Sequence, residues 1–197
     1  MVTLRDIWPK WAKTLRIMTT MPDAFDLLGI EPRFAIDAVE LDQRHRDLLS
    51  QLHPDRNPAP DAPDAREAHA ASLARLGDIN DAYRIISDPI RRAEQLLSRR
   101  GAGPMSGDDP ELLARIFEQR EAVDNATDRS DTDSLSIYAT AARKRQAALI
   151  EELEKFFESE PARVSVPQKT QIDRVLDELR YLKKLIERAE QALDELL

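Results

Sequence analysis

The strongest constraint on the fold is the spacing of apolar residues in the C-terminal segment that starts near Pro167. These residues follow one another in alternating steps of three and four, which places them along one seam of a long α-helix. A lone helix in water leaves such a seam exposed, so the pattern predicts that other helices pack against it. The seam consists of Ile172, Val175, Leu179, Leu182, Ile186, Ala189, Leu193 and Leu196.

Two further helical patterns precede this segment and supply packing partners. One covers residues 110–126 and the other residues 134–157. Three such helices joined by short loops form a small up-and-down bundle. The apolar face of the second pattern consists of Tyr138, Ala142, Leu149, Leu153 and Phe156.

The helix predicted over residues 110–126 carries two competing apolar stripes. One stripe contains Leu112, Ile116 and Val123, and the other contains Leu113 and Phe117. Both stripes have helical spacing, so periodicity does not decide which of them is buried. Phe117 is therefore either a core residue or an exposed aromatic side chain.

The N-terminal half predicts an antiparallel helical hairpin. Asp37 can cap a helix that ends near Leu52, and Asp64 can cap a second helix that ends near Ser87. Residues 56–65 between them contain three prolines, which remove hydrogen-bond donors and require a loop. The apolar positions are Ala38, Leu41, His45, Leu48, Leu49 and Leu52 in the first helix and Ala68, Ala71, Leu76, Ile79, Ala82, Tyr83 and Ile86 in the second.

A short helix and a linker connect the hairpin to the bundle. The helix begins at Pro89, a favoured first helical residue, and ends near Leu97. The segment at residues 101–110 holds three of the five glycines and indicates a linker. The chain shows no strand pattern, so we predict an all-α protein. Its predicted parts are an N-terminal extension at residues 1–20, a hairpin domain at 21–100, a linker at 101–109 and a three-helix domain at 110–197.

The N-terminal extension is basic and amphipathic. It contains four basic residues, Arg5, Lys10, Lys13 and Arg16, but only one acidic residue, and two tryptophans lie among them in the sequence. Such a segment is typical of a short surface helix, a frayed or flexible tail, or a targeting peptide. It can also arise from an upstream start codon, because Met21 opens a pattern that already fits the start of a domain.

Composition excludes several classes of function. A formal net charge of −8 argues against nucleic-acid binding, and no apolar segment approaches the roughly 20 residues of a membrane span. The chain has no cysteine, and its three histidines do not have a metal-binding spacing. It has neither a phosphate-binding glycine loop nor a nucleophile with a partner base. We therefore expect no enzyme activity, no catalytic residue, no metal and no cofactor.

The tripeptide His53-Pro54-Asp55 lies in the loop of the hairpin. Pro54 stiffens the turn and restricts the residue before it. Asp55 can accept charge-assisted hydrogen bonds from an arginine of a partner protein, and the ring of His53 offers a donor and an acceptor. These groups are suited to docking on another protein.

The setting of this tripeptide resembles the J-domain family. It lies between two helices, and the second contains Ile79-Asn80-Asp81-Ala82-Tyr83 and ends at Ser87-Asp88-Pro89. From Met21 to Leu197 the chain is also similar to the HscB family, in which a J-domain leads directly into a three-helix domain. The segments that carry this second resemblance are Phe25-Asp26-Leu27-Leu28-Gly29-Ile30, Asp88-Pro89-Ile90-Arg91-Arg92-Ala93-Glu94-Gln95-Leu96-Leu97, Gln119-Arg120-Glu121, Leu179-Arg180-Tyr181-Leu182-Lys183-Lys184-Leu185 and Ala189-Glu190-Gln191.

The resemblance implies a co-chaperone with two partners. One is a specialised DnaK/HscA-type chaperone whose ATPase it stimulates, and the other is the IscU-type scaffold protein on which iron–sulfur clusters are assembled. The implied compartment is the cytoplasm, or the mitochondrial matrix in a eukaryote. The implied chaperone-binding residues are Arg44, Arg46, His53, Pro54, Asp55, Arg56 and Asn57, and the implied scaffold-binding residues are Leu113, Ala114, Phe117, Glu118, Glu121, Arg180 and Tyr181.

Two features of the sequence depart from the family pattern. Asp42 and Asp47 accompany Arg44 and Arg46 on the helix before the loop, where the family usually presents a basic face. Ala114 is smaller than the family norm at its position. Two alternatives to this co-chaperone are a J-domain adaptor that recruits a different client and a structural helical protein in which the tripeptide is fortuitous.

Overall fold

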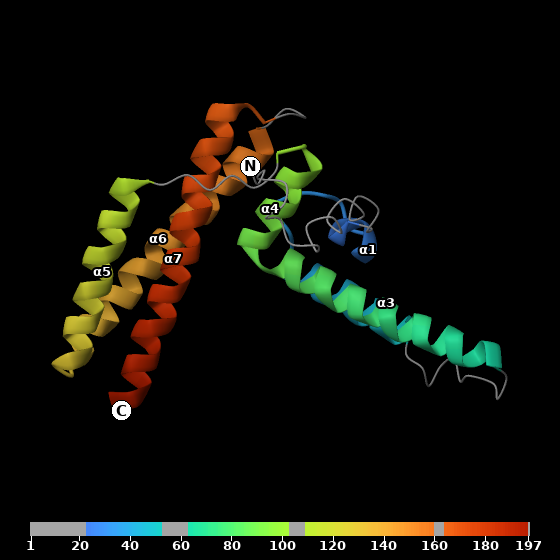
Figure 1. Ribbon diagram of the computed structural model, residues 1–197, viewed down its shortest axis with the longest axis horizontal. Helices are drawn as coiled ribbons and strands as arrows, with labels where there is room; N and C mark the ends of the chain where they lie inside the picture. The colour runs from blue at the N-terminus through green and yellow to red at the C-terminus, as the bar shows by residue number, and fades with distance from the viewer. Residues whose placement is uncertain (1–22, 53–62, 103–108, 160–163, 197) are drawn as a thin grey trace, which may run out of the picture. The chain divides into compact units, whose positions relative to one another are not determined.

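The computed structural model describes residues 23–52, 63–102, 109–159 and 164–196. All regular structure within these ranges is α-helical, which confirms the predicted all-α fold (Figure 1). Contacts group the chain into two compact units, and the border between them crosses the second and third helices. The helices are α1 (Ala24–Leu28), α2 (Ala38–Leu52), α3 (Pro63–Ser87), α4 (Pro89–Arg99), α5 (Pro110–Asp128), α6 (Thr132–Ser159) and α7 (Val166–Leu196).

The helix boundaries from α2 to α7 lie close to those predicted from the sequence. Asp37 caps α2 by accepting a hydrogen bond from the Val39 amide at 2.8 Å, as expected. Asp88 caps α4 in the same way, at 2.9 Å from the Ile90 amide. The predicted cap at Asp64 is wrong, because α3 already begins at Pro63.

The first unit contains residues up to Glu31 together with Gln43–Tyr83. Its short helix α1 is capped at both ends, by the Asp23 carboxylate at 2.9 Å from the Phe25 amide and by Gly29 in the left-handed conformation. Five residues are too few to show a helical period, which explains why the sequence pattern did not predict α1. Phe25 and Leu28 are fully buried and anchor α1 to the unit.

Helices α2 and α3 pack against each other as an antiparallel pair. His45 of α2 bonds Asn80 of α3 at 2.9 Å between Nε2 and Oδ1, and Ser72 Oγ of α3 donates to the Leu52 carbonyl at 3.0 Å. Contacts that link later residues of α2 to earlier residues of α3 define an antiparallel pair. Ile79 and Ala82 are buried as predicted, whereas Ala38 and Ala71, which were also predicted on the apolar faces, are exposed.

The second unit contains Pro32–Asp42 and Arg84–Leu197. Helices α5, α6 and α7 form its three-helix bundle (Figure 1). Side chains from all three helices fill the core, among them Val123, Leu149 and Leu179. Ion pairs at the surface join the helices, including Arg188 to Asp124 at 2.6 Å. The predicted seam of α7 is buried except at its end, where Leu193 is half-buried and Leu196 is exposed.

Helix α4 packs on this bundle through buried apolar residues and a stack of rings and guanidinium groups. Phe34 stacks on Phe157 of α6 with ring centroids 5.3 Å apart. The Arg92 guanidinium lies 4.9 Å from the Phe34 ring, and the Arg100 guanidinium lies 5.0 Å from the Phe157 ring. Two cations therefore enclose an aromatic pair, and this stack fixes α4 to α6.

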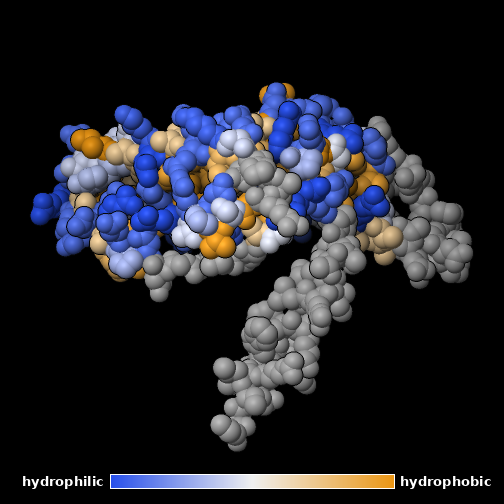
Figure 2. Space-filling view, turned by 90° about the horizontal axis from the view of Figure 1, so that it is seen from above, coloured by the Kyte–Doolittle hydropathy of each residue, from blue (hydrophilic) through white to orange (hydrophobic). Residues whose placement is uncertain are grey.

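The surface of the molecule is largely polar. Figure 2 shows a face on which hydrophilic residues predominate and apolar side chains are scattered between them. Charged residues make up 34% of the chain, which suits thin helices with much solvated area. None of the described helices combines the length and the hydropathy that a membrane crossing requires.

Candidate partner-binding surfaces

The first candidate surface is the end of α2 that leads into the predicted docking loop. Residues 53–62, which include His53, Pro54, Asp55, Arg56 and Asn57, lie outside the described residues. On both sides of this gap, α2 and α3 are tied together by the hydrogen bond from Ser72 to the last carbonyl of α2. This hydrogen bond therefore joins the last residue of α2 to a point within α3.

Arg44 and Arg46 of α2 have different surroundings. Arg44 Nε donates to the Leu28 carbonyl at 2.8 Å, so this side chain joins α2 to the end of α1. Arg46 is exposed and donates to Gln43 at 3.0 Å, while Gln43 donates to Asp47 at 2.8 Å. The exposed face thus presents a linked cation, amide and anion.

His45 lies in the core side of the hairpin. Its ring stacks on Tyr83 with centroids 4.2 Å apart and bonds Asn80 through Nε2. The side chain is half-buried between two helices. It therefore packs as an aromatic ring would at this position. Among the described residues, no group of three His, Cys, Asp or Glu side chains is placed to hold a metal.

The second candidate surface is one face of α5. Phe117 is 65% exposed and Leu113 is 44% exposed, whereas Leu112 and Val123 point into the bundle and are buried. The structure thus resolves the two competing stripes, since the Leu112 stripe is core and the Leu113 stripe faces solvent. Ala114, Glu118 and Glu121 are also exposed, and their helical spacing places them beside Leu113 and Phe117.

Tyr181 and Arg180 are neighbours on α7, but they reach different helices. The Tyr181 hydroxyl donates to the Ile116 carbonyl of α5 at 3.0 Å, and its ring is half-buried. Burial raises the pKa of the Tyr181 phenol, with smaller contributions from charges on α5. Arg180 instead bonds Glu94 of α4 and Asp177 of its own helix. Tyr181 thus adjoins the α5 surface, and Arg180 is drawn toward α4.

Electrostatics follow from these contacts. Burial alone would lower the pKa of Arg180, but hydrogen bonds and charges from Glu94 and Asp177 raise it. The guanidinium is cationic in any case. Sequence periodicity gave no signal for the pairing of Arg180 with Glu94, because the two residues lie far apart in the chain.

Comparison with known proteins identifies the family. The family model for the DnaJ domain matches residues 23–94, and the model for the HSCB C-terminal oligomerisation domain matches residues 108–190. A co-chaperone protein HscB homolog of Burkholderia multivorans is 33% identical over 171 residues, which cover 82% of this chain and 95% of that protein. The chain belongs to the HscB family of co-chaperones.

Other members of the HscB family match over nearly their whole length. A homolog from Shewanella baltica is 30% identical over 179 residues, which cover 88% of this chain and 98% of that protein. The solved structure of chaperone HscB from Vibrio cholerae superimposes with a TM-score of 0.74 and 27% identity, and it covers 89% of this chain and 99% of its own. The human co-chaperone HscB, at 20% identity and a TM-score of 0.70 over 88% of this chain and 82% of its own, shares the fold. The chain is therefore an HscB-family co-chaperone with an N-terminal J-domain and a C-terminal HscB domain.

Proposed function

We propose that this chain stimulates the ATPase of a DnaK/HscA-type chaperone and delivers to it an IscU-type scaffold protein of iron–sulfur cluster assembly. Residues 21–100 bind the chaperone in this proposal, and residues 110–197, beyond the linker at 101–109, bind the client. The ATP chemistry belongs to the chaperone, so the chain itself needs neither a catalytic residue nor a cofactor. The proposed location is the cytoplasm, or the mitochondrial matrix in a eukaryote.

The observation that best supports client delivery is the exposure of Phe117 on α5. An aromatic side chain that is 65% exposed buries little apolar surface in its own unit, so it contributes little to the stability of the fold. Exposed aromatic side chains are frequent anchors of protein interfaces, where they become buried in the partner. Leu113 lies one turn away and Glu118 and Glu121 border it, so the face combines an apolar centre with a charged rim.

Support for chaperone binding comes from the match to the DnaJ domain and from the antiparallel pair of α2 and α3 on either side of the predicted loop. We expect His53→Gln to abolish stimulation of the chaperone ATPase, because the imidazole is the group that the tripeptide presents for docking. Single-turnover ATP hydrolysis measures the stimulation, and circular dichroism verifies that the variant is folded. Full stimulation by a folded His53→Gln variant contradicts the proposed role of the tripeptide.

The client surface is tested with two residues of equal exposure. We expect Phe117→Ala to weaken scaffold binding by about 2 kcal/mol or more and to change the free energy of unfolding by less than about 0.5 kcal/mol. Ile137→Ala on α6 is the matched control, since Ile137 is also 65% exposed but lies outside the proposed surface. Calorimetric titration with the scaffold and unfolding in urea provide the two measurements.

The outcomes separate the proposed function from its alternative. Loss of binding in Phe117→Ala with native binding in Ile137→Ala supports scaffold delivery. Equal binding by both variants contradicts the assignment of this face. A generic J-domain adaptor is the second candidate, because Arg180 and Tyr181 of the proposed surface already make internal contacts. ATPase stimulation by a chain that does not bind the scaffold would favour this adaptor.

A further inference from the structure

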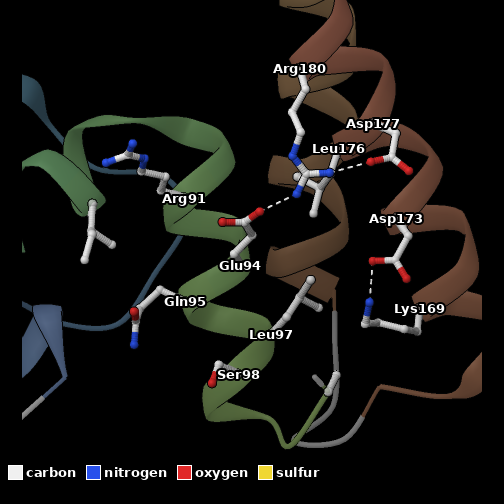
Figure 3. A pocket seen from close by; sticks show the side chains of 12 residues that line it. Arg91, Glu94, Gln95, Leu97, Ser98, Lys169, Asp173, Leu176, Asp177 and Arg180 are labelled. Carbon is white, nitrogen blue, oxygen red and sulfur yellow. Dashed lines mark hydrogen bonds and ion pairs between the residues drawn. The ribbon is translucent and has the colours of Figure 1, made fainter. Parts of the chain in front are cut away.

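A cleft of about 670 Å³ lies between α4 and α7 in the second unit (Figure 3). Its floor is apolar and includes Leu97 of α4 and Leu176 of α7, both of which are buried. Its rim carries charged groups, and Figure 3 shows Arg180 extended from α7 toward Glu94 of α4.

Two ion pairs join α7 to α4, and the first of them lies at the cleft. Arg180 pairs with Glu94, and its second nitrogen pairs with Asp177 on α7. One turn further along α7, Lys183 Nζ lies 3.1 Å from Asp88 Oδ2 at the start of α4. The side chains of Arg180 and Glu94 are both 44% exposed, so a partner protein can reach this pair.

The pairing turns Arg180 away from the exposed face of α5. Tyr181, the next residue, reaches α5 through the Ile116 carbonyl, whereas the Arg180 guanidinium reaches α4. A client carboxylate that pairs with Arg180 would do so at the expense of the pair with Glu94. Client binding and the Glu94 contact therefore compete for one cation.

We propose that Glu94 sets the affinity of the client surface by holding Arg180 against α4. This inference rests on the proposed function, because it assigns Arg180 to the interface with the scaffold protein. Glu94 acts here as a positioning residue and makes no contact with the client itself. Because coupling between two binding events is reciprocal, the bound client weakens the Arg180–Glu94 tie between the last helix of the J-domain and α7.

The expected size of the effect is modest. An exposed ion pair in water contributes weakly, and its removal corresponds to about a two- to five-fold change in an equilibrium constant. Salt screens exposed pairs, with a Debye length of about 10 Å at 0.1 M and about 3 Å at 1 M. A competition of charges must therefore fade at high salt, whereas a change in packing would persist.

The test is scaffold binding by the full chain and three variants, measured by calorimetric titration at low and high salt. Glu94→Gln keeps the shape of the side chain and removes its charge, so Arg180 is released. Asp88→Asn is the matched control, since it weakens the neighbouring Lys183 pair and leaves Arg180 in place. The double variant Glu94→Gln with Arg180→Ala, compared with Arg180→Ala alone, shows whether the effect of Glu94 acts through Arg180.

We expect Glu94→Gln to bind the scaffold about two- to five-fold more tightly than the unmodified chain at low salt. Asp88→Asn should bind as the unmodified chain does. In the Arg180→Ala background, Glu94→Gln should no longer increase the affinity. Unchanged or weaker binding by Glu94→Gln overturns the inference. Equal tightening by Glu94→Gln and Asp88→Asn overturns it as well, because the cause would then be general loosening of α4. Absence of scaffold binding by the unmodified chain instead refutes the proposed function, and with it the role of Glu94.

Discussion

Gly29 meets two separate structural requirements of the first unit. Its φ of 64° closes α1 in the left-handed conformation, which costs other residues energy because of their Cβ. Its missing Cβ also leaves space for Arg44, since a Cβ built there would lie 2.6 Å from a guanidinium nitrogen. That guanidinium in turn reaches the Leu28 carbonyl, so Gly29 permits the contact between α1 and α2.

We expect Gly29→Ala to lower the free energy of unfolding by about 1–2 kcal/mol, because alanine resists the left-handed conformation and displaces Arg44. Gly77→Ala is the matched control. Gly77 lies in the middle of α3, and a methyl group there would meet no neighbouring side chain within 4 Å, so alanine should stabilise the helix by up to about 1 kcal/mol. Unfolding in urea measures both, and an unchanged stability of Gly29→Ala would contradict this account.

At the scale of the elements, most helices could be predicted from the sequence because periodicity and caps are local signals. The apolar seam of α7 shows where the prediction ends. The structure also buries Leu176, Leu185 and Ala192 beside the predicted seam, because α7 packs against several helices and needs more than one apolar face. The same limit applied to α5, where only packing could decide between the stripe of Leu112 and that of Phe117.

A two-pronged ion pair connects α6 to α7. Arg145 of α6 donates to both carboxylate oxygens of Glu178, at 2.7 and 2.9 Å. These hydrogen bonds, together with nearby arginines, hold the pKa of Glu178 below its ordinary value of 4.5, although partial burial opposes the shift. The folded state therefore releases the proton of Glu178 more readily than the unfolded chain does.

The sign of the pH dependence follows from this lowered pKa. The contribution of Glu178 to stability is complete above pH 4.5, the ordinary pKa of the carboxyl, and is lost as the pH falls through its lower folded pKa. We expect the free energy of unfolding to fall on acidification in this range, and Glu178→Gln to make the fall shallower. Glu151→Gln is the control, since it removes a carboxylate from the exposed face of α6 and leaves the Arg145–Glu178 pair in place. Urea unfolding at a series of pH values provides the measurement, and equal slopes for Glu178→Gln and the unmodified chain would refute the assignment.

At the scale of the whole molecule, the family and the order of its domains could be predicted from short motifs, but contacts between distant segments could not. Phe34 stacks on Phe157 and Arg180 pairs with Glu94, and neither pair leaves a periodic or local trace in the sequence. The candidate client surface shows the same division. Its residues on α5 share one exposed face as a helical pattern requires, while the surroundings of Arg180 and Tyr181 depend on which helices pack beside α7.

The described fold begins with its own cap. The carboxylate of Asp23 closes the first turn of α1, and the match to the DnaJ domain also starts at residue 23. We therefore expect removal of residues 1–20, so that the chain starts at Met21, to leave both the thermal midpoint and the stimulation of the chaperone ATPase unchanged. The fully buried Phe25 supplies the contrast, because Phe25→Ala should cost about 3–5 kcal/mol of stability. Thermal unfolding followed by circular dichroism and single-turnover ATP hydrolysis measure the two properties. A clear drop in the midpoint of the shortened chain would show that Trp8 and Trp11 contribute to the stability of the protein.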